Sequence, residues 1–359
     1  MKKIIVIFAI ISSLLACSAE VERPSTPAEI VKDMGVGWNL GNTLDTKSAD
    51  KTDWHNPEAT KELVDAIRAK GYKTIRVPVT WQYDMAQGPD YTIEQSYLDR
   101  VEEVVNYGLD NDMYVIINIH HDEEIIEPTY ARYEESEKVA TSIWGQVAEH
   151  FKDYDYHLIF ENLNEMRVIG TEEEWKGGTA EGRDCMNKFH EAIVKTVRAK
   201  GGNNATRPIM ISPYAASCSQ VAIDELVVPQ DSNLIVAVHN YYPHSFCMPK
   251  DGTSEWGSDK DKEDIDVELD RVYNRFVAKG YAVVMGEWGS INRDNTAARA
   301  AHARYYATAC VKRQICPIWW DNGKCNPGHD TFGLIDRTTN TWINGEIADA
   351  MIEATKQEE

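Results

Sequence analysis

Hydrophobic residues along the chain gather in eight short runs, which are separated by longer segments of mixed polarity. Runs that are almost entirely apolar are typical of parallel strands covered on both faces. The segments between them place apolar residues at helical spacing. We therefore predict strands over residues 35–42, 73–79, 114–121, 158–165, 207–214, 233–242, 282–289 and 316–323. We predict helices over residues 57–70, 96–110, 136–151, 184–200, 220–228 (the weakest), 262–279, 296–312 and 344–356.

The regular alternation of these elements predicts an α/β protein that folds as a single (β/α)8 TIM barrel. An open doubly wound sheet is the competing arrangement, but it would normally carry a glycine-rich phosphate turn after its first strand. The segment from Gly35 to Gly41 does not match the GxGxxG pattern. Neither a linker nor an internal repeat interrupts the body, so residues 29–359 are expected to form one catalytic domain.

The first residues have the pattern of an export signal. Two lysines precede an apolar segment over residues 4–16, which is too short to span a bilayer as a stable helix. The segment ends in Leu-Leu-Ala followed by Cys17, which resembles a bacterial lipobox. We expect residues 1–17 to be a lipoprotein-type signal peptide and residues 18–28 a polar tether; an ordinary signal with a chance cysteine is the alternative. The protein is then secreted or held at the cell surface, with Cys17 its only membrane attachment, on a bacterial outer membrane.

Composition narrows the possible partners. Lys plus Arg number 37 and Asp plus Glu 58, which leaves a net charge of −21. A surface this acidic repels phosphate backbones and argues against a nucleic-acid partner. The chain is expected to be a monomer. A structural zinc is not expected, because the six cysteines of the body lack CxxC spacing with nearby histidine. Their pairing stays open: Cys185, Cys218, Cys247, Cys310, Cys316 and Cys325.

Polar side chains gather where the predicted strands end. The fourth run is apolar until Asn164 and Glu165, and burying such groups is costly unless they meet water, a ligand or a partner. In a parallel barrel the carboxyl ends of the strands carry the chemistry. The same end of the other strands supplies Asn39, Asn42, Arg76, His120, His121, His239, Tyr241, Glu287, Trp319, Trp320, Asp321 and Asn322.

Glu165 and Glu287 end strands four and seven, which face each other across a barrel of eight. Two carboxylates that flank a scissile bond are the device of glycoside hydrolysis, in which one is protonated and the other ionised. Arg76 would keep a neighbouring nucleophile ionised, Tyr241 could donate a hydrogen bond to it, and His239 could tune the acid. A retaining enzyme would hold the two carboxyl groups about 5–5.5 Å apart.

Several of these residues have a second interpretation. Glu161 rivals Glu165 but lies four residues deeper, so we expect it to be a buried partner of Arg76 or of a barrel amide. A metal-dependent hydrolase would use His120 and His121, but adjacent strand residues point to opposite faces, so no metal is expected. A non-catalytic sugar-binding barrel would not need an opposed pair of glutamates.

Two further groups are expected to have no part in the chemistry. The acidic run Asp122, Glu123 and Glu124 is expected to be a solvated loop. The remaining tryptophans are expected to be loop or packing residues, of which only some bind sugar: Trp54, Trp81, Trp175 and Trp256.

Seven motifs, in order, resemble glycoside hydrolase family 5 of clan A, and especially its subfamily 4 endoglucanases. The resemblance runs from about residue 30 to near the C-terminus. The motifs are GWNLGNTLD at 37–45, IRVP at 75–78, NIHH at 118–121, LNE at 163–165, HNYY at 239–242, GEWG at 286–289 and WWDNG at 319–323.

The resemblance implies a retaining, cofactor-independent enzyme in which Glu165 is the acid/base and Glu287 the nucleophile. It places Asn164 at the sugar 2-hydroxyl and gives the remaining residues to two subsites. Arg76, His120, His239, Tyr241 and Trp320 would line the reacting subsite, and Asn42, Asp45 and His121 the next one on the non-reducing side.

The implied substrate is a β-1,4-glucan cut internally: cellulose, mixed-linkage glucan or xyloglucan. Mannan or xylan is the alternative, with discrimination in loops 122–133, 172–182 and 245–264. The chain departs from the family pattern at Met166, where proline is common, and at Trp288, where phenylalanine is frequent. Neither departure replaces a reacting group, so they affect the local loop shape.

Overall fold

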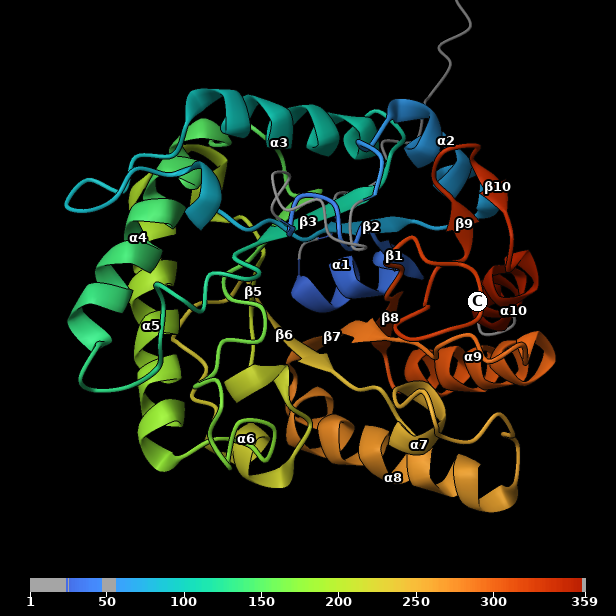
Figure 1. Ribbon diagram of the computed structural model, residues 1–359. Coiled ribbons are helices and arrows are strands. Elements are labelled where there is room, and N and C mark those ends of the chain that lie inside the picture. Colours follow the sequence, from blue (N-terminus) through green and yellow to red (C-terminus); the bar gives the residue numbers. More distant parts are fainter. Residues whose placement is uncertain (1–23, 25, 47–55, 357–359) are drawn as a thin grey trace, which may run out of the picture.

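The computed structural model describes residues 24, 26–46 and 56–356. Its centre is a closed barrel of eight parallel strands paired in sequence order, with β1 beside β8 (Figure 1). The strands are β1 (Gly37–Asn39), β2 (Thr74–Val77), β3 (Tyr114–Asn118), β4 (Leu158–Glu161), β5 (Ile209–Ile211), β6 (Leu234–His239), β7 (Ala282–Trp288) and β8 (Ile315–Trp319). The predicted TIM barrel is confirmed.

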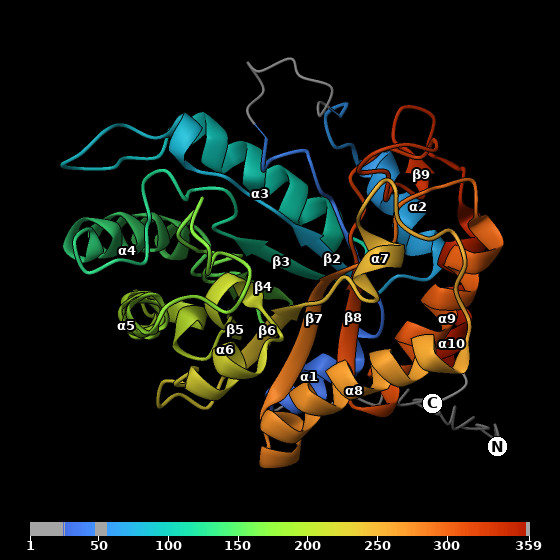
Figure 2. The same ribbon diagram turned by 60° about the horizontal axis from the view of Figure 1, so that its bottom comes forward.

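Helices surround the barrel and connect its strands (Figure 2). They are α2 (Lys61–Lys70), α3 (Gln95–Leu109), α4 (Tyr133–His150), α5 (Ala180–Ala199), α6 (Gln220–Glu225), α7 (His244–Cys247), α8 (Asp259–Arg275), α9 (Thr296–Lys312) and α10 (Gly345–Lys356). Each predicted helix is present. The strands are shorter than predicted: Asn42, His120, His121, Asn164 and Glu165 lie in the loops beyond their strands, whereas Asn39, Arg76, His239 and Glu287 remain in the sheet.

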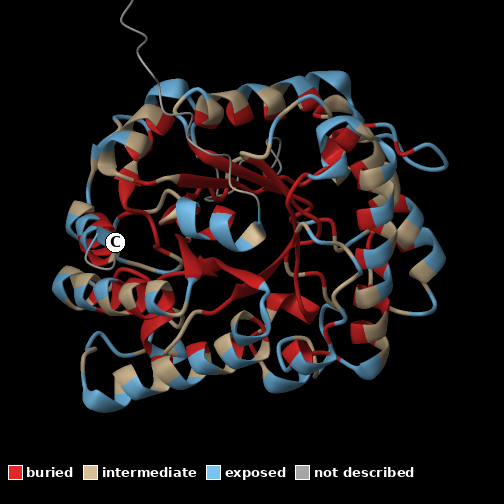
Figure 3. Ribbon diagram, turned by 180° about the vertical axis from the view of Figure 1, so that it is seen from behind, coloured by how far each residue is buried: buried red, intermediate tan, exposed pale blue. Residues whose placement is uncertain are grey.

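A short helix, α1 (Pro27–Met34), lies across the amino-terminal end of the barrel (Figure 3). Thr26 caps it: its side chain accepts from the Glu29 N–H, while the Glu29 carboxylate accepts from the Thr26 N–H. Ile30, Val31 and Met34 are buried against apolar residues from the barrel interior. We did not predict this helix, and it begins inside the predicted tether. The signal peptide, Cys17 and most of that tether lie outside the described residues.

Register shifts between the late strands help to build the site. The pairing of β6 with β7 shifts after Val238, so His239 lies opposite Glu287. The pairing of β7 with β8 shifts between Met285 and Trp288. Both irregularities lie at the carboxyl end of the barrel, where they re-aim side chains.

Two further findings concern the whole described chain. All six cysteines from Cys185 onward are buried and free. Within the described ranges, no helix is long and apolar enough to cross a membrane.

Candidate active site

Arg76 forms the base of the site. Its side chain is fully buried, and it donates to the Glu161 carboxylate at 2.7 Å and to the Asn39 side-chain carbonyl at 2.9 Å. It also donates to Glu287 Oε1 at 2.7 Å and to Asn164 Oδ1 at 2.6 Å. One cation on β2 therefore joins residues of three other strand ends, those of β1, β4 and β7, and Glu161 is a buried partner of Arg76 as the sequence predicted.

Glu287 is held on both carboxylate oxygens. Arg76 donates to one oxygen, and the Tyr241 hydroxyl donates to the other at 2.9 Å. Burial raises the pKa of Glu287, while the charges of His239 and Arg76 act in the opposite direction. Both hydrogen bonds favour the ionised form. The carboxylate is thereby fixed in orientation, with an exposed side-chain fraction of only 7%.

Glu165 and His239 form a second pair. His239 Nδ1 lies 2.8 Å from Glu165 Oε1 and 3.8 Å from Glu287 Oε2. Burial disfavours the charged form of both groups. The hydrogen bond and charge of His239 nevertheless lower the pKa of Glu165. The charges of Glu287 and Glu165 raise the pKa of His239. Both shifts favour a protonated His239 beside an ionised Glu165 in the free protein, whereas a resting acid would hold the proton on Glu165. The proton is one hydrogen bond away from the carboxylate that would use it.

The two glutamates meet over the barrel. An oxygen of Glu165 and an oxygen of Glu287 lie within 4.8 Å of each other, with His239 in the same group. Inverting glycosidases need about 6.5–9.5 Å between the carboxyl groups, to leave room for a water. Gly286 makes room for this grouping, because a Cβ at that position would lie 2.9 Å from His239 Nε2.

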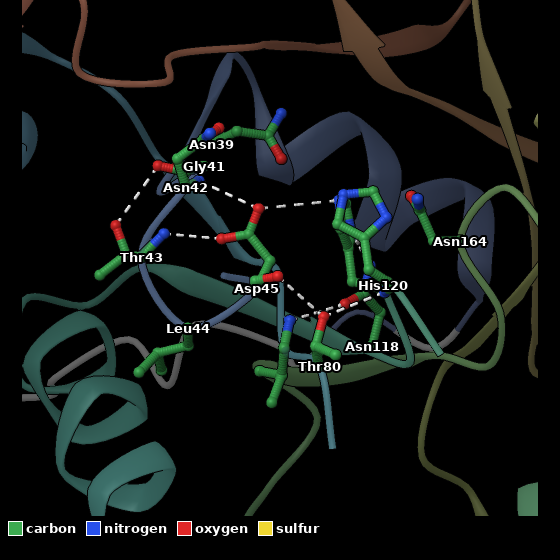
Figure 4. Close-up of polar contacts among 12 residues, drawn as sticks. Asn39, Gly41, Asn42, Thr43, Leu44, Asp45, Thr80, Asn118, His120 and Asn164 are labelled. Carbon is green, nitrogen blue, oxygen red and sulfur yellow. Dashed lines mark hydrogen bonds and ion pairs between the residues drawn. The ribbon is translucent and has the colours of Figure 1, made fainter. Parts of the chain in front are cut away.

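Asp45, His120 and Trp320 form the neighbouring part of the site. The Asp45 carboxylate accepts backbone N–H groups from Asn42 at 3.0 Å and Thr43 at 2.6 Å, and it faces His120 Nε2 at 3.9 Å (Figure 4). The His120 ring is parallel to Trp320, with centroids 5.8 Å apart. The structure thus groups the predicted residues of this region.

The protonation of His120 follows from its neighbour Asn118. The Asn118 amide is fixed because its oxygen accepts the Val79 N–H and its nitrogen donates to Glu161. That nitrogen also donates to His120 Nδ1 at 3.1 Å, so the ring carries its proton on Nε2. Burial lowers the pKa of His120 well below its usual value, which agrees with a neutral ring.

The expectation that the His120 and His121 rings point to opposite faces is wrong. Strand β3 ends at Asn118, so the alternation of side chains does not reach these residues, and their rings lie 4.4 Å apart. Their nitrogens and an Asp45 oxygen lie within 4.8 Å of one another. The Nε2 proton of His120 nevertheless points toward Asp45, which disfavours coordination there.

Two other expectations need correction. Asp122 is not solvated: it is buried and accepts the N–H groups of Trp81 and Gln82, and burial raises its pKa to about 7. The Glu123 side chain is also largely buried. Burial lowers the pKa of His121, but the hydrogen bond to Glu123, together with the nearby negative charges, acts more strongly, and the pKa of His121 is raised to about 9.

The four tryptophans expected in loops or packing differ from one another. Trp81 is fully buried, and Trp256 packs against His302. Trp54 lies outside the described residues. Trp175, by contrast, is 58% exposed. Only its surroundings in the folded chain distinguish it from the packing tryptophans.

A closed parallel barrel with two opposed carboxylates at the ends of β4 and β7 defines a barrel glycoside hydrolase. Comparison with known proteins identifies the family. The model described as Cellulase (glycosyl hydrolase family 5) matches residues 35–326. The chain belongs to glycosyl hydrolase family 5.

Individual relatives are similar over most of the chain. Cellulase/esterase CelE of Acetivibrio thermocellus is 48% identical over 92% of this chain, which spans 40% of that relative's length. Among solved structures, a GH5-4 broad specificity endoglucanase from Clostridium acetobutylicum has 47% identity and a TM-score of 0.90, covering 92% of this chain and 100% of that one. ZgEngAGH5_4 in complex with a cellotriose has 50% identity and a TM-score of 0.88, covering 92% and 99%.

Proposed function

We propose that the protein is a retaining endo-β-1,4-glucanase in which Glu287 is the nucleophile and Glu165 the acid/base. The observation that carries the proposal is the approach of the two carboxylates within 4.8 Å. The endoglucanase named above and the cellotriose complex support a β-glucan substrate. Family membership supports retention of the anomeric configuration.

The contacts of each glutamate support its role. Glu287 would attack the anomeric carbon while Arg76 and Tyr241 hold its two oxygens in place. Glu165 would protonate the leaving oxygen, and then deprotonate the water that releases the sugar from the enzyme. Asn164, fixed by Arg76, is proposed to contact the sugar 2-hydroxyl.

His239 supplies the proton that this cycle needs. In the free site the two pKa directions across the 2.8 Å contact favour the proton of the His239–Glu165 pair on His239. When Glu287 gives its charge to the new bond to sugar, one of the two negative charges that stabilise the His239 cation is lost. The proton then moves toward Glu165, so attack and protonation of the leaving group are coupled.

The neighbouring residues are proposed to bind the sugars before the cleaved bond. His120 would donate from Nε2, and Trp320 beside it would present an aromatic floor. Asn42, Asp45 and His121 would contact the next sugar. No cofactor is proposed for this chemistry.

A panel of soluble polysaccharides with sizing of the products tests the proposal. We expect β-1,4-glucan or mixed-linkage glucan to be cut internally, with an early fall in chain length. Faster cleavage of mannan or xylan than of glucan would show that the protein is a mannanase or a xylanase. Hydrolysis of none of these β-glycans would contradict the proposal.

We also propose that the protein is exported and anchored through Cys17 as a monomer on a bacterial outer membrane. The signal pattern of residues 1–17 supports this location. Metabolic labelling with a radioactive fatty acid, compared with Cys17→Ser, tests the anchor. Light scattering of the soluble body tests the monomer.

A further inference from the structure

Arg167 lies two residues beyond Glu165, and its guanidinium makes three hydrogen bonds, one from Nε and two from Nη1. It donates to Glu123 at 2.7 Å and to Glu174 at 3.1 Å. It also donates to the backbone carbonyl of Glu165 itself at 3.0 Å. A planar guanidinium can make these bonds together, whereas a single ammonium group cannot match their spread. The main chain at Glu165 is thereby tied to Glu123, on the loop that follows β3, and to Glu174, farther along its own loop.

Trp175 covers the flat face of the same guanidinium. Its ring centroid lies 4.4 Å from Arg167 Cζ, within the range of a cation–π contact. More than half of the tryptophan surface remains exposed. A large ring that is backed by a fixed cation and open on its outer side has the form of a platform for the apolar face of a sugar.

The loop that carries Trp175 lies on the β5 side of the barrel. The Val168 N–H donates to the Tyr214 hydroxyl at 2.8 Å, and a Cβ at Gly178 would lie 2.6 Å from the Tyr214 ring. The proposed sugar-binding residues Asn42 and Trp320, by contrast, follow β1 and β8. These strands lie across the barrel from β5 (Figure 1). Because Asn42 and Trp320 are proposed to hold the sugars before the cleaved bond, the leaving group is expected on the β5 side, where the loop of Trp175 lies.

We propose that Arg167 is a positioning residue that fixes the main chain of Glu165 and backs Trp175 as an aromatic platform for the sugar of the leaving group. This inference rests on the proposed roles of Glu165 and Glu287. Met166, between Glu165 and Arg167, lacks the ring by which a proline fixes φ. The main chain at Glu165 therefore depends more on the hydrogen bond from Arg167. The Met166 carbonyl accepts the Ala215 N–H at 3.2 Å.

Arg167→Lys and Trp175→Ala separate the two parts of the inference. Arg167→Lys keeps the charge and loses the three-way geometry, while Trp175→Ala removes the platform from an exposed position. Arg198→Lys is the matched control. Arg198 also pairs with a carboxylate, Asp231, and donates to backbone carbonyls, but it lies on α5 away from the site.

Each variant is assayed by kcat/KM on two kinds of substrate. The dinitrophenolate of a 2,4-dinitrophenyl cellobioside leaves without acid assistance. The leaving sugar of a cello-oligosaccharide needs a proton from Glu165. We expect Arg167→Lys to lower kcat/KM for the oligosaccharides about 10- to 100-fold and to change the dinitrophenyl substrate less than about threefold. We expect Trp175→Ala to raise KM for the oligosaccharides about 3- to 10-fold with kcat and the dinitrophenyl substrate nearly unchanged.

The outcomes distinguish the inference from the proposed function. The positioning role is overturned if Arg167→Lys lowers kcat/KM equally on both substrates. It is also overturned if Arg198→Lys lowers kcat/KM by the same factor, since either result shows a structural role only. An unchanged KM in Trp175→Ala would overturn the platform. Inactivity of the wild type on both substrates would instead overturn the proposed function, and this inference with it.

Discussion

Replacing Arg76 by methionine is the sharpest test of how the site is held together. The substitution keeps an apolar stem of similar length and removes four hydrogen bonds of 2.6–2.9 Å. Two of these reach carboxylates, Glu161 and Glu287, that are almost completely buried. Breaking a buried ion pair by removing one partner costs about 3–5 kcal/mol, because the other charge stays uncompensated. We expect the free energy of unfolding to fall by about that amount.

A double-mutant cycle isolates the cause. Glu161→Gln removes one of the two stranded charges, so Arg76→Met combined with Glu161→Gln is expected to be more stable than Arg76→Met alone. Urea unfolding followed by tryptophan fluorescence measures the four stabilities. A loss below about 1 kcal/mol in Arg76→Met would place the pair in the range of a solvated surface contact. Such a loss, or a double variant no more stable than Arg76→Met, would refute the reasoning.

Three further predictions address the chemistry and the barrel closure. Glu287→Gln should abolish turnover, whereas Glu165→Ala should be partly rescued by azide or by an activated leaving group; full activity on cello-oligosaccharides in either variant removes that residue from its role. Because the pKa of His239 is raised on folding, its ion pair stabilises the protein below its ordinary pKa of about 6.5 and is lost as pH rises through the raised value. His239→Gln should therefore flatten the fall in stability with rising pH, measured as the unfolding midpoint. Met34→Ala in α1 should cost about 2–5 kcal/mol and Thr26→Ala about 1 kcal/mol, and equal thermal midpoints would contradict a packed, capped helix.

The sequence anticipated the barrel because each strand carries its own signal. An apolar run with helical segments on both sides predicts a buried parallel strand whatever the rest of the chain does. The helix α1 gave no such signal. Its three buried residues Ile30, Val31 and Met34 are too few to stand out, and their burial depends on a barrel end made by distant strands.

The candidate site was anticipated in part, for the same reason. Glu165 and Glu287 interrupt apolar strands, which marks them in the sequence, and Glu161 was correctly assigned as the partner of Arg76. The His120 and His121 rings lie together, against the prediction, because β3 ends at Asn118 and the alternation of a strand does not reach them. Asp122 was taken for a solvated residue because a run of acidic residues in sequence does not reveal which member turns inward.

The sequence by itself determined which residues could do the chemistry and at which end of the barrel they lie. The apolar character of each strand and the position of each polar residue in its run are local properties, so the order of residues alone reveals both. Only the tertiary structure decided which groups touch. Arg76 binds residues up to 211 positions away, and His239 faces Glu287 only because β6 and β7 shift register. The state of each proton depends on those contacts, since burial and neighbouring charges act over a few ångströms of space and not along the chain.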